Sequence, residues 1–422
     1  MTATDHAADL GAFVSASPSS FHAAAEGARR LATAGFAAQD EREPWDPSPG
    51  GHYVVRDGAL LAWRVPAGAG PTIPFRIVGA HTDSPTFKLK PRPDVGGFGW
   101  QQLGVEVYGG PLLNSWLDRE LGLAGRLALT DGSTPLVRTG AIMRIPQLAI
   151  HLDRGVNADG LKLDPQQHTA PVWSVGHRGA SILDHLADVA GCTRNEIDGY
   201  DLVAFDSALP AVFGGHGEFF AAGRLDNLSS VHAALTALVA SPGSERIELV
   251  AAFDHEEVGS ATRSGAAGPL LADVVSRILG SLGASADQRH QSLAGSVCLS
   301  ADAGHAVHPN YPGRHDPANL PVLNGGPLLK LNANQRYATD AAGAALWRRA
   351  CRRAGVPTQE FVSNNALPCG STIGPLTATR LGIATIDVGV PLLSMHSARE
   401  LAGMEDPWSL SLAISAFFAL EP

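Results

Sequence analysis

Predominantly apolar runs of strand length punctuate both ends of the chain. Clear examples are residues 72–80 (TIPFRIVGA), 246–253 (RIELVAAF), 296–301 (SVCLSA) and 381–390 (LGIATIDVGV). Strands that are apolar on both faces are typical of a sheet buried under helices. Helical, Ala-rich patterns accompany them at residues 9–36, with an interruption near Pro18, at 226–240 and at 339–354. The pattern predicts an α/β fold, with a parallel or mixed sheet covered by helices on both faces.

The pattern of apolar and polar residues changes in the middle of the chain. Between about residues 92 and 221, short alternating segments are separated by turn residues. Residues 126–138 (RLALTDGSTPLVR) predict a hairpin with Asp131-Gly132 at its turn. A chain of 422 residues is longer than a single hydrophobic core usually accommodates, which suggests two domains. We therefore expect a discontinuous α/β domain from residues 1–90 and 222–422, with a β-rich domain inserted at 91–221.

Composition narrows the class of protein. The chain is 45% hydrophobic and 17% charged, which is typical of a folded globular protein. A net charge of −10 argues against a nucleic-acid partner, and no apolar run of about 18 residues predicts a membrane span. The first 20 residues lack the pattern of a signal peptide. The four cysteines form no C-x-x-C pair, so we expect a cytoplasmic protein.

Residues able to bind metal stand where the predicted strands end. Candidate ligands follow all four strands, and one more begins the helix at 226–240: His81, Glu257, Asp302, His396 and Asp226. In open α/β sheets, ligand sites form beyond the carboxyl ends of the strands, so these side chains are expected to converge. Imidazoles mixed with carboxylates suit zinc, cobalt or manganese. Two divalent ions would balance the three carboxylates and one bridging hydroxide.

Two further residues have supporting roles in this interpretation. Glu256 and Glu257 are adjacent, so one can bind metal while the other faces the water as general base. Asp83 can accept the ring proton of His81 and orient it. Each candidate also has a structural interpretation: a helix N-cap for Asp226, a solvated charge pair for the two glutamates, and an ordinary histidine for His81.

An ordered series of motifs runs along nearly the whole chain. The motifs are SASPSSFHA, GAHTDSPTFKLKP, VYGGPLLNSWLDRELGLAGR, RIPQLAIHLDR, GRLDNLSS, FDHEEVGS, SADAGHAVHPNY, LNANQRYATD, PCGSTIGP and SMHSARE. With them the chain resembles the aspartyl aminopeptidase family of co-catalytic zinc metallopeptidases. One departure is Ala366, where family members often carry Asp two residues before the Pro of PCGSTIG. This change affects no proposed ligand.

The resemblance assigns roles to the candidate residues. It implies His81 and His396 as terminal ligands, Asp226 as the bridge between two ions, Glu257 and Asp302 as the remaining ligands, and Glu256 as the catalytic base. It also implies that the β-rich insertion serves as a dimerisation and lid domain. Members often form tetrahedral dodecamers whose active sites face an interior chamber. His151 would then enter a neighbouring subunit's site and stabilise the tetrahedral intermediate; a buried histidine of the β-rich module is the alternative.

The resemblance also implies a pocket for an acidic side chain. Lysine occurs at only four positions, and the family's pocket matches Lys330, with Tyr337 nearby. A lysine on an apolar strand is costly unless its charge is paired, so a structural salt bridge is the alternative. The implied reaction is removal of N-terminal Asp, and also Glu, from peptides by a metal-activated water.

Other functions stay open on the sequence. One is a related two-metal aminopeptidase of broader or glutamyl preference. Another is a scaffold with an inactive site, which the complete set of six core residues disfavours. A serine hydrolase is disfavoured because no G-x-S-x-G motif occurs.

Overall fold

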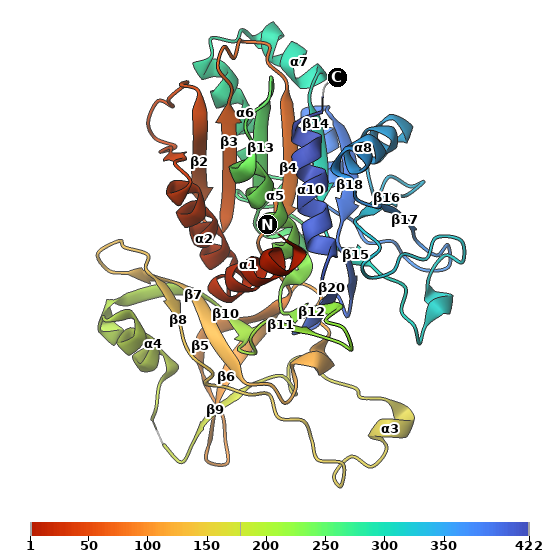
Figure 1. Ribbon diagram of the computed structural model, residues 1–422. Helices are drawn as coiled ribbons and strands as arrows, with labels where there is room; N and C mark the ends of the chain where they lie inside the picture. Colours follow the sequence, from red (N-terminus) through yellow and green to blue (C-terminus); the bar gives the residue numbers. More distant parts are fainter. Residues whose placement is uncertain (1, 178, 421–422) are drawn as a thin grey trace.

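A nine-stranded mixed sheet forms the centre of the molecule in a computed structural model that describes residues 2–177 and 179–420 (Figure 1). Its order is β1-β2-β3-β13-β4-β14-β18-β16-β17. The four predicted strands are confirmed and lie parallel in the middle of it: β13 (Ile247–Phe253), β4 (Phe75–His81), β14 (Val297–Ala301) and β18 (Ala384–Gly389). The outer strands are β1 (Ala37–Ala38), β2 (Gly50–Arg56), β3 (Ala59–Val65), β16 (Leu328–Leu331) and β17 (Gln359–Val362).

Helices cover both faces of this sheet, as the apolar runs predict. Alternate residues of one strand enter different cores: Val250 packs with the helices of one face and Leu249 with those of the other. The first face carries α1 (Ala3–Ala16), α2 (Ser20–Thr33), α5 (Leu225–Ala240), α8 (Ala341–Ala354) and α10 (Asp406–Phe418). The second carries α6 (Leu270–Ser281), α7 (Ala286–Ala294) and α9 (Gly374–Leu381).

The middle of the chain forms an antiparallel sheet of its own, in the order β8-β7-β10-β5-β6-β9. The predicted hairpin is confirmed, with Arg126 opposite Leu136. The strands are β5 (Thr86–Val95), β6 (Trp100–Tyr108), β7 (Leu121–Leu129), β8 (Leu136–Arg138), β9 (Val172–Val175) and β10 (Ile197–Asp206). With α4 (Ile182–Ala190) this sheet encloses a separate apolar core, below the nine-stranded sheet in Figure 1.

A third sheet joins the end of the middle segment to the C-terminal region. Its order is β11-β12-β20-β19-β15, and the strands are β11 (Ala211–Phe213), β12 (Phe219–Ala222), β20 (Glu400–Gly403), β19 (Pro391–Leu393) and β15 (Gly304–His305). Judged by strand pairing, the segment of the chain that has its own sheet and core spans residues 86–206. Residues 211–222 pair instead with the C-terminal strands. The remaining short elements are α3 (Val156–Asp159) and the 3-10 turns η1 (Leu113–Trp116), η2 (Arg194–Glu196), η3 (Glu256–Val258) and η4 (Pro312–Arg314).

No helix in the described part of the chain combines the length and the hydropathy that a membrane crossing requires.

A buried histidine makes the stability of the fold depend on pH. The His6 side chain on α1 is 0% exposed and packs on the rings of His232 and Trp408. Burial, reinforced by His232, lowers the pKa of His6 to about 3. The unfolded chain therefore binds this proton near pH 6.5 while the folded chain does not. The stability due to His6 is complete above pH 6.5 and is lost as the pH falls toward 3.

Between pH 6.5 and 5, His6 should lower the free energy of unfolding by about 2 kcal/mol. His6→Phe, which keeps an aromatic ring in the same packing, should remove that share of the pH dependence. The measurement is denaturant unfolding at pH 6.5 and pH 5, with His290→Gln as control, because His290 is exposed. Equal pH slopes for wild type and His6→Phe would contradict the prediction.

Candidate metal centre

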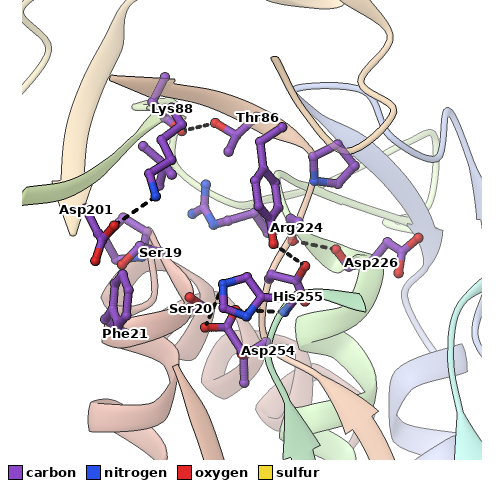
Figure 2. Close-up of a pocket in the computed structure, with 18 of the residues that line it drawn as sticks. Ser19, Ser20, Phe21, Thr86, Lys88, Asp201, Arg224, Asp226, Asp254 and His255 are labelled. Carbon is purple, nitrogen blue, oxygen red and sulfur yellow. Dashed lines mark hydrogen bonds and ion pairs between the residues drawn. The ribbon is translucent and has the colours of Figure 1, made fainter. Parts of the chain in front are cut away.

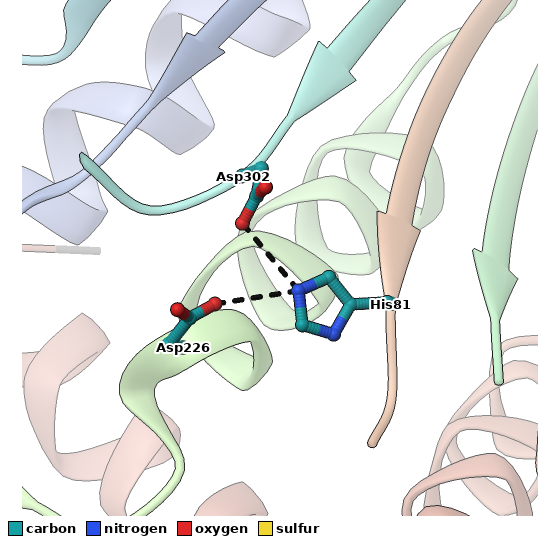
Figure 3. A group of neighbouring side chains, drawn as sticks. All are labelled: His81, Asp226 and Asp302. Carbon is teal, nitrogen blue, oxygen red and sulfur yellow. Dashed lines mark ion pairs between the residues drawn. The ribbon is translucent and has the colours of Figure 1, made fainter. Parts of the chain in front are cut away.

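The predicted ligands converge at the carboxyl ends of the central strands of the sheet. His81 is the last residue of β4, Asp302 follows β14 directly, and Asp226 lies in the first turn of α5. Figure 3 shows these three side chains pointing toward one another from their separate elements. They are 1%, 7% and 4% exposed, respectively. Burial on this scale is not that of ordinary surface side chains, so these polar groups need partners.

A second group of ligands lies on the other side of Asp226. His396, in the loop between β19 and β20, places its Nε2 3.5 Å from Asp226 Oδ2 and 3.4 Å from Glu257 Oε2. On the first side, His81 Nε2 lies 3.3 Å from Asp226 Oδ1 and 3.4 Å from Asp302 Oδ1. The two groups of potential ligands therefore share Asp226, with one oxygen turned to each.

These distances suit metal coordination better than hydrogen bonding. They exceed the usual N–H···O range of about 2.7–3.2 Å. They match the edge, about 3.4 Å, of a tetrahedron around an ion with bonds of about 2.1 Å. Asp226 Oδ1 and Glu257 Oε1 are also buried without any hydrogen-bond partner. Cations at the two groups would satisfy both oxygens.

The electrostatics of the cluster point the same way. Burial alone would lower the pKa of His81, but the adjoining Asp226 and Asp302 carboxylates raise it well above its usual value. Burial, together with the negative charge of Asp226, raises the pKa of Glu257. Bare protein therefore holds protons among these groups. Divalent cations would take the place of the protons, since metal ligands bind in their deprotonated forms. The residues fit a metal site.

Asp83 orients several parts of the cluster at once. His81 Nδ1 lies 3.1 Å from the Asp83 backbone oxygen and 3.4 Å from Asp83 Oδ1. The Asp83 carboxylate also accepts hydrogen bonds from the Glu256 and Glu257 backbone N–H groups, at 3.0 and 3.1 Å. The Tyr108 hydroxyl donates a third, at 2.8 Å. Asp83 thus links the histidine at the end of β4 to the glutamate turn after β13.

Glu256 is partly buried and lies beside the ligands. It begins η3, directly after His255, whose left-handed backbone (φ 63°) turns the chain sharply after β13. Glu256 can offer an oxygen to the same space as His81 and Glu257. Burial is the main cause that raises the pKa of Glu256 to about 7, and the charge of Asp302 adds to it. The side chain of Glu257 is 5% exposed, so the solvated-pair interpretation of Glu256-Glu257 is wrong.

Lys330 and Tyr337 lie next to the first ligand group. Lys330 on β16 is 1% exposed, and its Nζ donates a hydrogen bond to the Ala303 backbone oxygen at 2.6 Å. The same Nζ is 4.0 Å from Asp302 Oδ2 and 5.3 Å from the centre of the Tyr337 ring. The buried ammonium group of Lys330 therefore lies next to Asp302, one of the candidate ligands.

His151 lies away from the cluster within its own chain. It is exposed in a turn shortly before α3, so the alternative of an ordinary buried histidine is wrong. The loop that carries α3 projects from the body of the molecule (Figure 1). Among the described residues, His151 joins none of the groups that could hold a metal ion.

Two supporting residues escaped the sequence reasoning. One is Tyr108, and the other is Glu400, which lies in SMHSARE and is fully buried. Burial is the first cause that raises the pKa of Glu400 to about 8, followed by the charge of Asp226. Both residues lie in the quoted motifs, but only contacts across the sheet edge show what they touch.

A cavity of about 230 Å³ adjoins the site, between the glutamate turn and the β-rich part of the chain (Figure 2). Figure 2 shows Asp254 and His255 on one side of it, and Lys88 paired with Asp201 on the other. Arg126 bridges Asp201 and Asp57 there, at 3.0 and 2.8 Å. The Arg126–Asp57 pair joins the middle sheet to the turn between β2 and β3 of the central sheet.

Comparison with known proteins identifies the family. Residues 13–418 match the family model described as "Aminopeptidase I zinc metalloprotease (M18)". A "Probable M18 family aminopeptidase 2" from Streptomyces coelicolor is 54% identical over 419 residues, 98% of this chain and 97% of that protein.

Two solved structures share the fold. The M18-family aminopeptidase from Thermotoga maritima has a TM-score of 0.89 at 25% identity, covering 99% of this chain and 96% of that one. The mApe1 dodecamer from S. cerevisiae has a TM-score of 0.86 at 29% identity, covering 98% and 96%. With the family model spanning nearly all of its length and a buried cluster of zinc-type ligands at its sheet edge, this chain belongs to the M18 family of zinc aminopeptidases.

Proposed function

We propose that this zinc aminopeptidase removes acidic residues, Asp and also Glu, from the N-termini of peptides. The observation that carries the specificity is Lys330, a buried cation beside the ligand cluster. A buried carboxylate binds well only where a positive charge pairs with it. The chain carries a net charge of −10, so local positive charge is needed to accept an acidic substrate.

Two divalent ions per subunit are part of this proposal. His81 and Asp302 would hold one, Glu257 and His396 the other, and Asp226 would bridge them, in line with the shared geometry of Asp226. Zinc is supported by the family, while the ligand chemistry also accommodates cobalt or manganese. Bound at this position, the ions supply Lewis-acid polarisation of the scissile carbonyl and acidify water.

The protein side chains then do the remaining work. Glu256 takes a proton from the attacking water and delivers it to the leaving amine, a role that its place beside His81 and Glu257 supports. Asp83 fixes the His81 ring and the turn that carries Glu256 relative to each other. Lys330 binds the carboxylate of the substrate side chain, and Tyr337 forms part of the wall around it.

A broader-specificity aminopeptidase is the second candidate. It is favoured by the contacts of Lys330, whose ammonium group already contacts the Ala303 backbone oxygen and Asp302. These contacts are those of a lysine that stabilises the fold and does not bind substrate. The experiment compares hydrolysis of Asp-, Glu- and Leu-terminated peptides by metal-free protein to which single metals are restored. Preference for acidic substrates supports our proposal. Equal rates for all three peptides support the alternative. If no hydrolysis that a chelator can inhibit is found, the protein is a scaffold with an inactive site.

Self-association is a further part of the proposal. One structural relative, mApe1 of S. cerevisiae, is a dodecamer, which supports assembly of this chain into a homododecamer built from dimers. Residues 91–221 would then act as the dimerisation and lid domain. All four cysteines are free thiols, which supports our proposal of a cytoplasmic location.

His151→Ala should lower kcat without changing metal content or oligomer size. An imidazole aimed at the developing oxyanion is worth roughly 3 kcal/mol. The exposed position of His151, away from its own site, suits a role in a neighbouring subunit. Mixing His151→Ala with Glu256→Gln subunits should restore activity, because some sites then combine both intact residues. Verified subunit exchange without recovered activity would exclude the role in a neighbour.

A further inference from the structure

The side chain of Glu400 ties together two separate segments that carry ligands. Its Oε2 accepts a hydrogen bond from the backbone N–H of Asp226 at 2.9 Å. Its Oε1 accepts one from the backbone N–H of His396 at 2.7 Å. The carboxylate therefore connects the start of α5 to the loop between β19 and β20 from a position that is 2% exposed.

This arrangement leaves the metal-facing atoms free. Because Glu400 binds only backbone groups, both carboxylate oxygens of Asp226 remain turned to the two ligand groups. The His396 ring is fixed separately, with its Nδ1 3.0 Å from the Gly110 backbone oxygen, so that Nε2 faces Asp226 and Glu257. Backbone and ring are thus held by different partners.

We propose that Glu400 is a positioning residue that sets the separation of Asp226 and His396, and through it the affinity of the ion bound by His396, Glu257 and Asp226. This inference rests on the two-ion site proposed above. The ion held by His81 and Asp302 shares only Asp226 with Glu400, so it depends on Glu400 less. Glu400 therefore acts unequally on the two ions.

The position of Glu400 in the fold does not depend on its carboxylate. It begins β20, which pairs with β12 through backbone bonds, with Glu400 opposite Ala222. Replacing the carboxylate leaves this backbone pairing in place and changes only the contacts to the backbone N–H groups of Asp226 and His396. Gln at this position keeps one acceptor oxygen, but its NH₂ group would face the second N–H, donor against donor. One of the two segments is then released.

Asp406 offers a matched control. Its carboxylate is 0% exposed and also accepts two backbone N–H bonds, from Asn324 at 2.7 Å and Gly326 at 2.9 Å. Neither of these partners is a candidate metal ligand. Asp406→Asn therefore repeats the chemical change of Glu400→Gln, a buried carboxylate to an amide, away from the cluster.

The test is stepwise zinc titration of metal-free protein against a chromophoric chelator. In Glu400→Gln, the dissociation constant of one ion should rise about 10- to 100-fold, the usual range for residues that orient ligands, and that of the other should rise less. Asp406→Asn should lower Tm but leave both zinc constants at wild-type values. Glu400→Asp, which keeps the charge on a shorter arm, should weaken the same ion as Glu400→Gln.

Each other outcome has a defined meaning. Wild-type zinc constants in folded Glu400→Gln or Glu400→Asp would overturn the role of Glu400. So would an equal loss of affinity in Asp406→Asn, because a general loss of stability would then explain both. A wild-type protein that binds only one zinc would overturn the two-ion site itself, and with it the unequal effect proposed here.

Discussion

Glu256→Gln should lower turnover by about 10²–10⁴-fold while both zinc dissociation constants stay near their wild-type values. The substitution keeps the size of the side chain but removes the group that takes the proton from water. It leaves all five candidate ligands in place, and the backbone N–H of Glu256 can still donate to Asp83. The measurement is kcat on an Asp-terminated peptide together with metal analysis of the same sample.

The neighbouring glutamate supplies the control. Glu257 approaches His396 Nε2 at 3.4 Å and carries an unpartnered buried oxygen. Glu257→Gln should therefore lose zinc affinity as well as turnover. If Glu256→Gln hydrolyses peptides at nearly the wild-type rate, Glu256 is not the base. If it loses zinc as readily as Glu257→Gln, Glu256 acts as a ligand instead.

Lys330→Met should reduce kcat/KM for Asp-terminated peptides far more than for Leu-terminated peptides. Met fills a similar volume on β16 without the charge. A substrate carboxylate left buried and unpaired costs on the order of 2–5 kcal/mol, or roughly 30- to 5,000-fold. A Leu side chain places no charge there and should lose little.

The same variant separates the two interpretations of Lys330. Its Nζ lies 4.0 Å from Asp302 Oδ2, so a purely structural lysine would act by holding that ligand. In that case Lys330→Met would weaken zinc binding and slow Asp and Leu substrates equally. A selective loss of the Asp substrate with unchanged zinc constants would establish Lys330 as the specificity residue.

Much of the site could be predicted because each signal is local. A run such as RIELVAAF marks a buried strand by its own side chains, and the residue after it marks the sheet edge, whatever the rest of the chain does. All four predicted strands, the hairpin at 126–138 and the two-sided helical cover were therefore predictable. The convergence of His81, Asp302 and Glu257 followed from one general rule about strand ends.

The structure corrected expectations that depended on burial. His151 is exposed, which excludes an ordinary buried histidine, and the Glu257 side chain, at 5% exposed, is too enclosed to be half of a solvated pair. The third sheet was not predicted, because β11, β15 and β19 have only two or three residues each and show no period. Strands this short form only where distant partners are already in place.

The sequence by itself determined the strands, the α/β class, the family motifs and the identity of the candidate ligands, since these depend on side-chain type and spacing within a few residues. Only the tertiary structure decided that Asp226 turns one oxygen to each ligand group, that Glu400 links Asp226 to His396, and that Lys330 lies beside Asp302. The physical reason is distance along the chain. These contacts join segments that meet only when the sheets close, so no local pattern encodes them.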